Sequence, residues 1–130
     1  MTSNVFGYPG GCGLATPRKR AARVILGGGA GFAARAVEQF LARGVDVCTA
    51  IALDELHSIA ARKNPMAVVL PVETAGESGY LTCAKLRLMR PKMRVVLVGE
   101  ATPRAERLAR FVGARFATEA TAADVVLKLI

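Results

Sequence analysis

Short apolar runs alternate along the chain with segments whose apolar residues recur at helical spacing. Unbroken or alternating apolar runs of this length are typical of strands, whereas recurrence every three to four residues is typical of helices. The strands are predicted at 24–26, 45–50, 66–70, 95–98 and 114–118. The helices are predicted at about 31–43, 53–64, 79–90, 105–112 and 122–129.

The predicted strands are apolar on both faces, as in 66–70 and 95–98. Central strands of a parallel sheet have this character because helices cover both sides of the sheet. Successive β-α units of this length predict an α/β fold with a doubly wound, five-stranded parallel sheet. The expected architecture is flavodoxin-like, with strand order 2-1-3-4-5. Gly44 and Gly113 follow predicted helices and are expected to terminate them.

The chain divides into a tail and one domain. Residues 1–22 are rich in glycine, contain a basic triplet and have no apolar period, which predicts a flexible N-terminal tail. Residues 23–130 are predicted to form the single folded domain. No apolar run approaches the roughly 20 residues that a membrane-spanning helix needs, and no signal-peptide pattern is recognisable. We therefore expect a cytoplasmic protein with no membrane partner.

The cysteine and histidine content argues against a metal site. Cys12, Cys48 and Cys83 form no C-x-x-C pair, and His57 is the lone histidine. A structural zinc site needs four such ligands at short spacing, so none is expected. Cys48 and Cys83 fall on apolar faces and are predicted to be small core residues. No cofactor is predicted.

The net charge of +8 is concentrated late in the chain. Between positions 85 and 115 only Glu100 and Glu106 oppose nine basic residues. The nine are Lys85, Arg87, Arg90, Lys92, Arg94, Arg104, Arg107, Arg110 and Arg115. Such a field favours an acidic partner, a phosphate-bearing ligand or nucleic acid, although an ordinary solvated surface has the same composition.

A glycine-rich segment follows the first predicted strand. Gly27, Gly28, Gly29 and Gly31 precede or open the first helix, and Gly29-x-Gly31-x-x-Ala34 fits a relaxed dinucleotide-binding pattern. Glycines there allow backbone amides to approach a phosphate at a helix N-terminus. The second strand, however, ends Cys48-Thr49-Ala50, without the acidic residue that would hold a ribose. The segment is thus either a glycine-rich turn or a loop that holds a phosphate group.

The order and spacing of the elements over about residues 22–130 resemble the receiver domain of bacterial two-component systems. The interval from Pro71 to Gly79 and the pair Gly113-Ala114 match receiver features. Residues 69–72 and 79–86 also resemble a segment of a pseudo-receiver domain from a myxobacterial motility regulator.

The resemblance implies where the phosphorylation chemistry of a receiver would lie. A working receiver has two acidic residues after the first strand, a phosphoacceptor Asp after the third, a Ser or Thr after the fourth and a Lys after the fifth. The corresponding positions here are Gly27, Gly28, Pro71, Gly99 and Glu119, the last with one residue of slack. Glycine and proline side chains bind no Mg²⁺ and accept no phosphoryl group. The resemblance therefore implies a degenerate receiver that is not an enzyme and is not phosphorylated.

A receiver without this chemistry can still bind proteins. Receivers generally pair through the face of the fourth helix, fifth strand and fifth helix, which here carries Arg104, Arg107 and Arg110 in one row and Arg115 near its edge. We therefore expect a phosphorylation-independent interaction module that binds an acidic protein or a second copy of the chain. A small-ligand sensor using the Gly27–Gly31 segment is the first alternative. Nucleic-acid binding through 85–115 is the second, which a scarcity of aromatic residues there disfavours.

Overall fold

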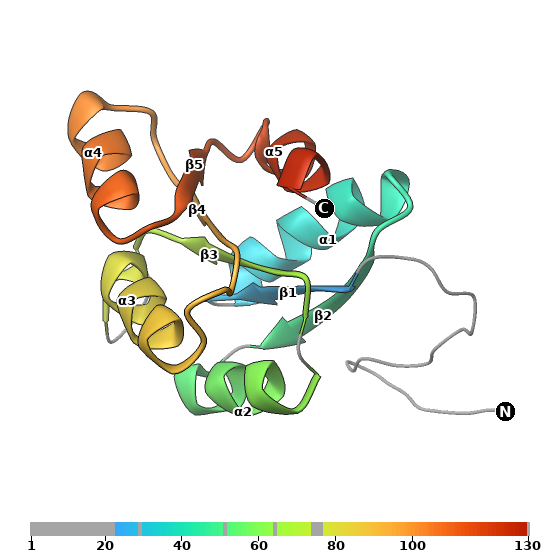
Figure 1. Cartoon of the computed structure of the whole chain (residues 1–130). Coiled ribbons are helices and arrows are strands. Elements are labelled where there is room, and N and C mark those ends of the chain that lie inside the picture. The colour runs from blue at the N-terminus through green and yellow to red at the C-terminus, as the bar shows by residue number, and fades with distance from the viewer. Residues whose placement is uncertain (1–22, 29, 51, 64, 74–76, 130) are drawn as a thin grey trace, which may run out of the picture.

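The computed structural model describes residues 23–28, 30–50, 52–63, 65–73 and 77–129. The predicted tail, 1–22, lies outside these residues. Five strands alternate with five helices through the described part (Figure 1). The strands are β1 (Arg23–Gly27), β2 (Asp46–Ala50), β3 (Ala67–Pro71), β4 (Val95–Val98) and β5 (Arg115–Ala117). The helices are α1 (Ala30–Ala42), α2 (Leu53–Lys63), α3 (Gly79–Met89), α4 (Pro103–Phe111) and α5 (Ala122–Leu129).

The strands form one parallel sheet in the order β2-β1-β3-β4-β5, which confirms the predicted fold class and topology. Leu26 of β1 pairs with Val69 of β3 at the centre, and Pro71 at the end of β3 pairs with Val98 of β4. All strands run in one direction, so their carboxyl ends meet at one edge of the sheet. In open α/β sheets this is the edge at which ligands bind.

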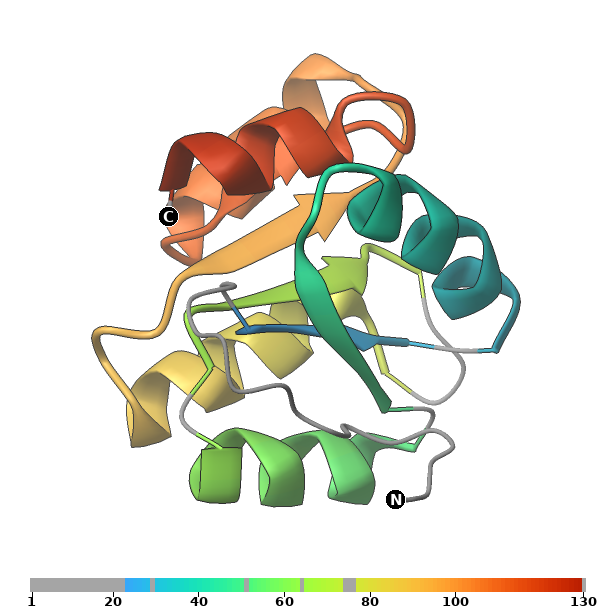
Figure 2. The same ribbon diagram turned by 90° about the vertical axis from the view of Figure 1, so that its right-hand side faces the viewer.

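Alternate side chains of each central strand point into two different cores, one on each face of the sheet. Ile25 packs in the core beneath α2, α3 and α4, whereas Val24 and Leu26 pack in the core beneath α1 and α5. Figure 2 shows α1 and α5 on one side of the strands and α2 and α3 on the other, and Ala109 of α4 packs in the same core as α2 and α3. Because helices cover both faces of the sheet, the central strands are nearly unbroken apolar runs.

Two helices end at glycines in the left-handed conformation, as the sequence predicts. Gly44 after α1 has φ 75° and Gly113 after α4 has φ 80°. At α4 the Gly113 amide donates to the Arg110 carbonyl and the Ala114 amide to the Ala109 carbonyl. This paired arrangement satisfies carbonyls that the helix itself leaves free, and a left-handed residue there favours glycine.

The sequence-based boundaries hold to within a few residues. The first strand is longer than predicted and includes Gly27, and β3 extends to Pro71. Cys48 and Cys83 are buried, as expected of small core residues. Within the described ranges no helix has the length and apolar character needed to cross a bilayer.

Candidate functional site

A cavity of about 850 Å³ lies where the strands end at the carboxyl edge of the sheet. Four of the positions selected from the sequence line it together: Gly28, Pro71, Gly99 and Glu119. They follow or end β1, β3, β4 and β5 respectively, so the parallel sheet brings together residues that are far apart in sequence. The fifth position, Gly27, is buried at the end of β1 and does not line the cavity.

The glycines at this edge are packed closely by apolar side chains. A Cβ atom on Gly27 would lie 2.8 Å from Leu70 Cδ2 and 3.3 Å from Leu56 Cδ1. A Cβ atom on Gly99 would lie 2.7 Å from Val72 Cγ2. Carbon atoms in van der Waals contact are normally at least about 3.5 Å apart. Larger side chains at Gly27 or Gly99 therefore require neighbouring residues to shift.

The glycine-rich segment, for which the sequence left a turn and a phosphate-holding loop open, is divided between two elements. Gly27 belongs to β1 and Gly31 to the first turn of α1. Gly28 between them has φ 100°, a conformation that favours glycine, and Gly29 lies outside the described residues. Of the four glycines, Gly28 alone lines the cavity as far as the described residues go.

An ion pair spans one side of the cavity. Arg35 of α1 donates from Nε to Glu119 Oε1 at 3.0 Å and from Nη2 to Glu119 Oε2 at 2.9 Å. The hydrogen bond and the charge of Arg35 lower the pKa of the Glu119 carboxyl, and the same contacts raise the pKa of Arg35. Two parallel bonds of this kind fix the geometry of both side chains. Sequence reasoning placed Glu119 at the site but missed Arg35, which lies 84 positions away.

Two further carboxylates, Glu73 and Glu100, line the cavity. Both are exposed, and each lies in a segment after the end of its strand. Among the described residues no three or more histidine, cysteine, aspartate or glutamate side chains are arranged to hold a metal ion. The cavity is therefore polar at its rim without being organised as a cation site in the described part of the chain.

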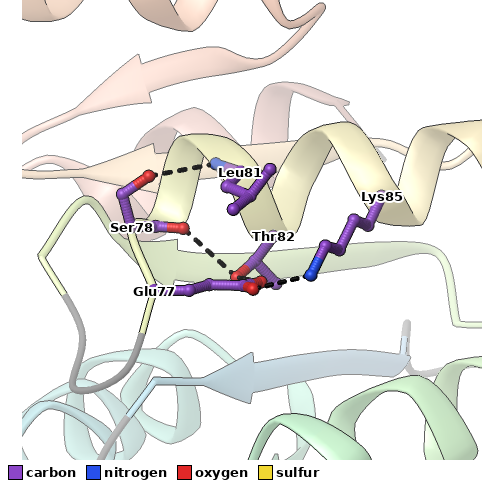
Figure 3. A network of polar contacts seen from close by, with 5 residues as sticks. All are labelled: Glu77, Ser78, Leu81, Thr82 and Lys85. Carbon is purple, nitrogen blue, oxygen red and sulfur yellow. Dashed lines mark hydrogen bonds and ion pairs between the residues drawn. The ribbon is translucent and has the colours of Figure 1, made fainter.

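The start of α3 at the cavity is fixed by a network of polar contacts (Figure 3). The Ser78 hydroxyl caps the helix by accepting from the Leu81 amide at 3.2 Å. The Thr82 hydroxyl donates to Glu77 Oε2 at 2.6 Å, and Lys85 Nζ donates to Glu77 Oε1 at 2.8 Å. The bonds from Lys85 and Thr82 lower the pKa of Glu77. Thr82 is fully buried, so this network anchors α3 beside the end of β3.

Gly79, the first residue of α3, lies very close to the backbone of Pro71 at the end of β3. A Cβ atom there would lie 2.2 Å from the Pro71 carbonyl oxygen. The Gly79 amide donates to the Val72 carbonyl at 2.9 Å, which holds the helix start against the chain leaving β3. The contact is with backbone, so no side-chain rotation can relieve it. A residue other than glycine at position 79 requires the backbone to move.

The arginine row predicted from the sequence lies on α4. Arg104 lines the cavity and, with Arg107 and Arg110, also lines an open hollow of about 600 Å³ on the helix surface. Arg115 is exposed on β5 and lines another surface hollow together with Arg110. Phe111 completes the hollow and is almost fully exposed. The sequence did not identify Phe111 as an exposed surface residue.

Two other side chains with reactive groups, Cys83 and His57, are buried and half-buried respectively. Burial raises the pKa of the Cys83 thiol to about 11, so the thiolate form is scarce at neutral pH. His57 of α2 is half-buried, and its Nδ1 atom is buried with no hydrogen-bond partner among the described residues. Neither group lines the cavity.

The sequence matches no protein-family model, and no curated protein is detectably similar to it. Solved structures, by contrast, identify the fold as that of response-regulator receiver domains. The chemotaxis protein CheY4 of Vibrio cholerae is 16% identical, with a TM-score of 0.74 over 85% of this chain and 100% of that one. The receiver domain of NarL from Mycobacterium tuberculosis is 20% identical, with a TM-score of 0.73 over 85% of this chain and 96% of that one.

A third similar structure is a response regulator from Burkholderia pseudomallei that holds a phosphorylated aspartic acid. It is 19% identical, with a TM-score of 0.69 over 83% of this chain and 65% of that one. Identities of 20% or less establish a shared fold and leave the chemistry of the site to the residues themselves.

Proposed function

We propose that this chain is a degenerate receiver domain that binds other proteins without being phosphorylated. The observation that carries the proposal is the close packing at Gly27 and Gly99. Leu56 and Leu70 occupy the space beside Gly27, and Val72 occupies the space beside Gly99. On this proposal the site has been filled with apolar side chains, so that restoring one polar residue would not restore its chemistry.

The residues at the cavity do not fit the Mg²⁺ that phosphotransfer in a receiver requires. Mg²⁺ takes oxygen ligands in near-octahedral geometry, usually including one or two carboxylates. Gly28, Pro71 and Gly99 offer no side-chain oxygen, and Glu119 is already bound by Arg35. The exposed Glu73 and Glu100 also line the cavity, but among the described residues they belong to no group of three side chains arranged to hold a metal ion. Where the receiver pattern has a lysine, a carboxylate would repel an incoming phosphoryl group. We therefore derive no phosphotransfer step for this chain.

Phosphorylation is tested directly by treating the protein with acetyl phosphate and Mg²⁺ and measuring its intact mass. The expected result is an unchanged mass, with the Burkholderia pseudomallei response regulator as the positive control because its structure holds a phosphorylated aspartic acid. A stable adduct of one phosphoryl group on this chain would overturn the proposal. The same samples are examined by NMR, where the amide resonances of the residues lining the cavity should not move.

Protein binding is proposed to use the arginine row of α4, Arg104, Arg107 and Arg110. These guanidinium groups pair with no acidic side chain of the described residues, so their charge is available to a partner. Cross-linking in the native cell should recover a partner that is lost when all three are changed to glutamate. The matched control changes the exposed Arg62, Lys92 and Arg94 to glutamate, which alters net charge equally and should preserve binding.

Two results would redirect the proposal. Loss of the partner in both triple variants would mean that net charge, rather than the α4 surface, controls binding. A rise in melting temperature with added nucleotide would instead favour a phosphate-binding role for the segment from Gly27 to Gly31.

A further inference from the structure

The most exposed large apolar side chains of the described residues lie on α3 and α4. Phe111 on α4 is 86% exposed and Leu88 on α3 is 83% exposed. Leu81, one heptad before Leu88 and therefore on the same side of α3, is 48% exposed. Single exposed apolar residues are ordinary, but a group on neighbouring helices marks a surface that a partner can cover.

Contacts between α3 and the residues just after α4 place the carboxyl-terminal parts of the two helices near each other. The Cys83 thiol lies 3.7 Å from the Val112 carbonyl oxygen, and the Arg87 side chain lies against Gly113. Leu88 follows Arg87, and Phe111 precedes Val112, so both mark the carboxyl end of the α3–α4 pair. Figure 1 shows the two helices as neighbours on one face of the sheet.

Basic and apolar groups alternate along the exposed side of α4. Leu108 and Phe111 line the 600 Å³ hollow together with Arg104, Arg107 and Arg110. Arginine and aromatic residues, phenylalanine included, are enriched in protein interfaces relative to the rest of the protein surface. The hollow therefore has an apolar centre and a positively charged edge.

We propose that the outer side of α3 and α4 binds an acidic segment of a partner protein that inserts bulky apolar side chains beside Phe111. We define this α3–α4 surface as Leu88, Arg104, Arg107, Leu108, Arg110 and Phe111. The proposal rests on the proposed interaction function and names the chemistry of the partner. The positive edge selects acidic residues, and the exposed Leu88 and Phe111 select apolar ones.

The same charges argue against a second copy as the occupant. A two-fold contact through this surface would set the arginines of one α4 against those of the other. Like charges placed opposite each other across an interface oppose binding. Nucleic acid would satisfy the arginines, but its backbone has no apolar group to cover Leu88 and Leu108. These two occupants are therefore outcomes that the experiment has to separate.

The test is a selection from a displayed library of random peptides on the purified full chain. Peptides are counted as specific when they are not retained by the Phe111→Ala variant. The expected result is enrichment of peptides that carry acidic residues together with two or more Leu, Ile or Phe. Synthetic copies should bind about tenfold more weakly to Phe111→Ala and to Leu88→Ala, as expected for loss of a buried apolar contact.

The matched control is Leu41→Ala on α1, which removes another exposed leucine from the opposite face of the sheet. This variant should bind the peptides with unchanged affinity, and all three alanine variants should keep the wild-type melting temperature because the side chains are exposed. A synthetic peptide with its apolar residues changed to alanine should bind the wild-type protein about as weakly as the original peptide binds the Phe111→Ala and Leu88→Ala variants.

Four outcomes would overturn the inference. They are no enriched peptide, enrichment of basic or uncharged peptides, equal loss of affinity in Leu41→Ala, and equal binding by the alanine-substituted peptide. Binding of a single-stranded DNA oligonucleotide that is lost in Phe111→Ala would assign the surface to nucleic acid. The phosphodonor experiment is independent of these results, so a failed selection with an unchanged mass would reject this surface alone.

Discussion

The carboxyl edge of the sheet and the outer side of α4 both carry charged side chains, but these side chains are paired within the chain only at the edge, as far as the described residues go. At the edge, Arg35 and Glu119 bind each other with two hydrogen bonds. On α4, Arg104, Arg107 and Arg110 form no ion pair with the described residues. The first region satisfies its charges within the chain, and the second leaves them to the surroundings.

Packing differs between the two regions in the same direction. Gly27, Gly79 and Gly99 at the edge have almost no free space beside them, whereas Phe111 on α4 is almost fully exposed. Residues that pack closely or form ion pairs inside the fold contribute to its stability. Exposed apolar side chains and unpaired charged side chains are instead available to a partner. The comparison predicts that substitutions at the edge change stability and that substitutions on α4 change binding.

The largest effect on stability is expected from Gly79→Ala. The added methyl group would lie 2.2 Å from the Pro71 carbonyl oxygen, so the start of α3 must move away from β3. We expect a loss of about 3 kcal/mol in the free energy of unfolding, measured by urea denaturation. Gly31→Ala is the control, because its nearest neighbour is a side-chain atom of Arg35 at 3.6 Å and alanine favours the helix. Equal effects of the two substitutions would contradict the tight contact.

Gly99→Ser should have the next largest effect. Its Cβ would meet Val72 Cγ2 at 2.7 Å, and we expect a loss of about 1 to 2 kcal/mol. In the double variant with Val72→Ala the clash is removed, so the combined loss should be smaller than the sum of the two single losses. Strict additivity in urea denaturation would show that Val72 does not fill this space. The double variant should also remain inert to acetyl phosphate.

A smaller effect is expected from the ion pair at the cavity. Arg35 lowers the pKa of Glu119, so the pair stabilises the fold above the ordinary glutamate pKa, and this contribution is lost as the pH falls through the lowered value. In Arg35→Gln, the pKa of Glu119 should rise towards its ordinary value in an NMR titration of the side-chain carboxyl. Both side chains are about half exposed, so solvent screening keeps the change in stability small. An unchanged pKa of Glu119 would mean that the pair does not form in solution.

The smallest effect on stability is expected on α4. Changing Arg104, Arg107 and Arg110 to glutamine removes no side-chain hydrogen bond or ion pair with the described residues, so the free energy of unfolding should stay within about 0.5 kcal/mol of the wild-type value. The same variant should bind the selected acidic peptides much more weakly. A large loss of stability would mean that these arginines stabilise the fold, as the residues at the cavity edge do. The two regions would then not differ in their contribution to stability.

The sequence was sufficient for the fold because the strands are short, the central ones are mostly apolar, and recognisable helix ends separate them. Gly44 and Gly113 mark such ends by a backbone conformation that other residues rarely adopt. Residues 95–98 form β4 as predicted, because an all-valine and leucine run leaves no ambiguity. The ends of β1 and β3 were less predictable, because Gly27 and Pro71 are poor strand formers that neighbouring strands hold in place.

The contacts of the site could not be predicted in the same way. That Arg35 meets Glu119, and that Val72 fills the space beside Gly99, depends on how α1 and the segment after β3 pack against the sheet. Periodicity shows which side of a helix is buried but not which distant residue faces it. The exposure of Phe111 was equally hidden, because an aromatic residue at the end of an amphipathic helix is normally expected in the core.

The two outermost strands limit how these molecules can associate through their backbones. β5 has only three residues and begins with the exposed Arg115, and β2 at the other edge begins with the exposed Asp46. A short edge flanked by charge presents few free amide and carbonyl groups, which hinders the joining of one sheet to the next. Concentrated solutions of the protein should therefore resist fibril formation by edge-to-edge pairing of their sheets.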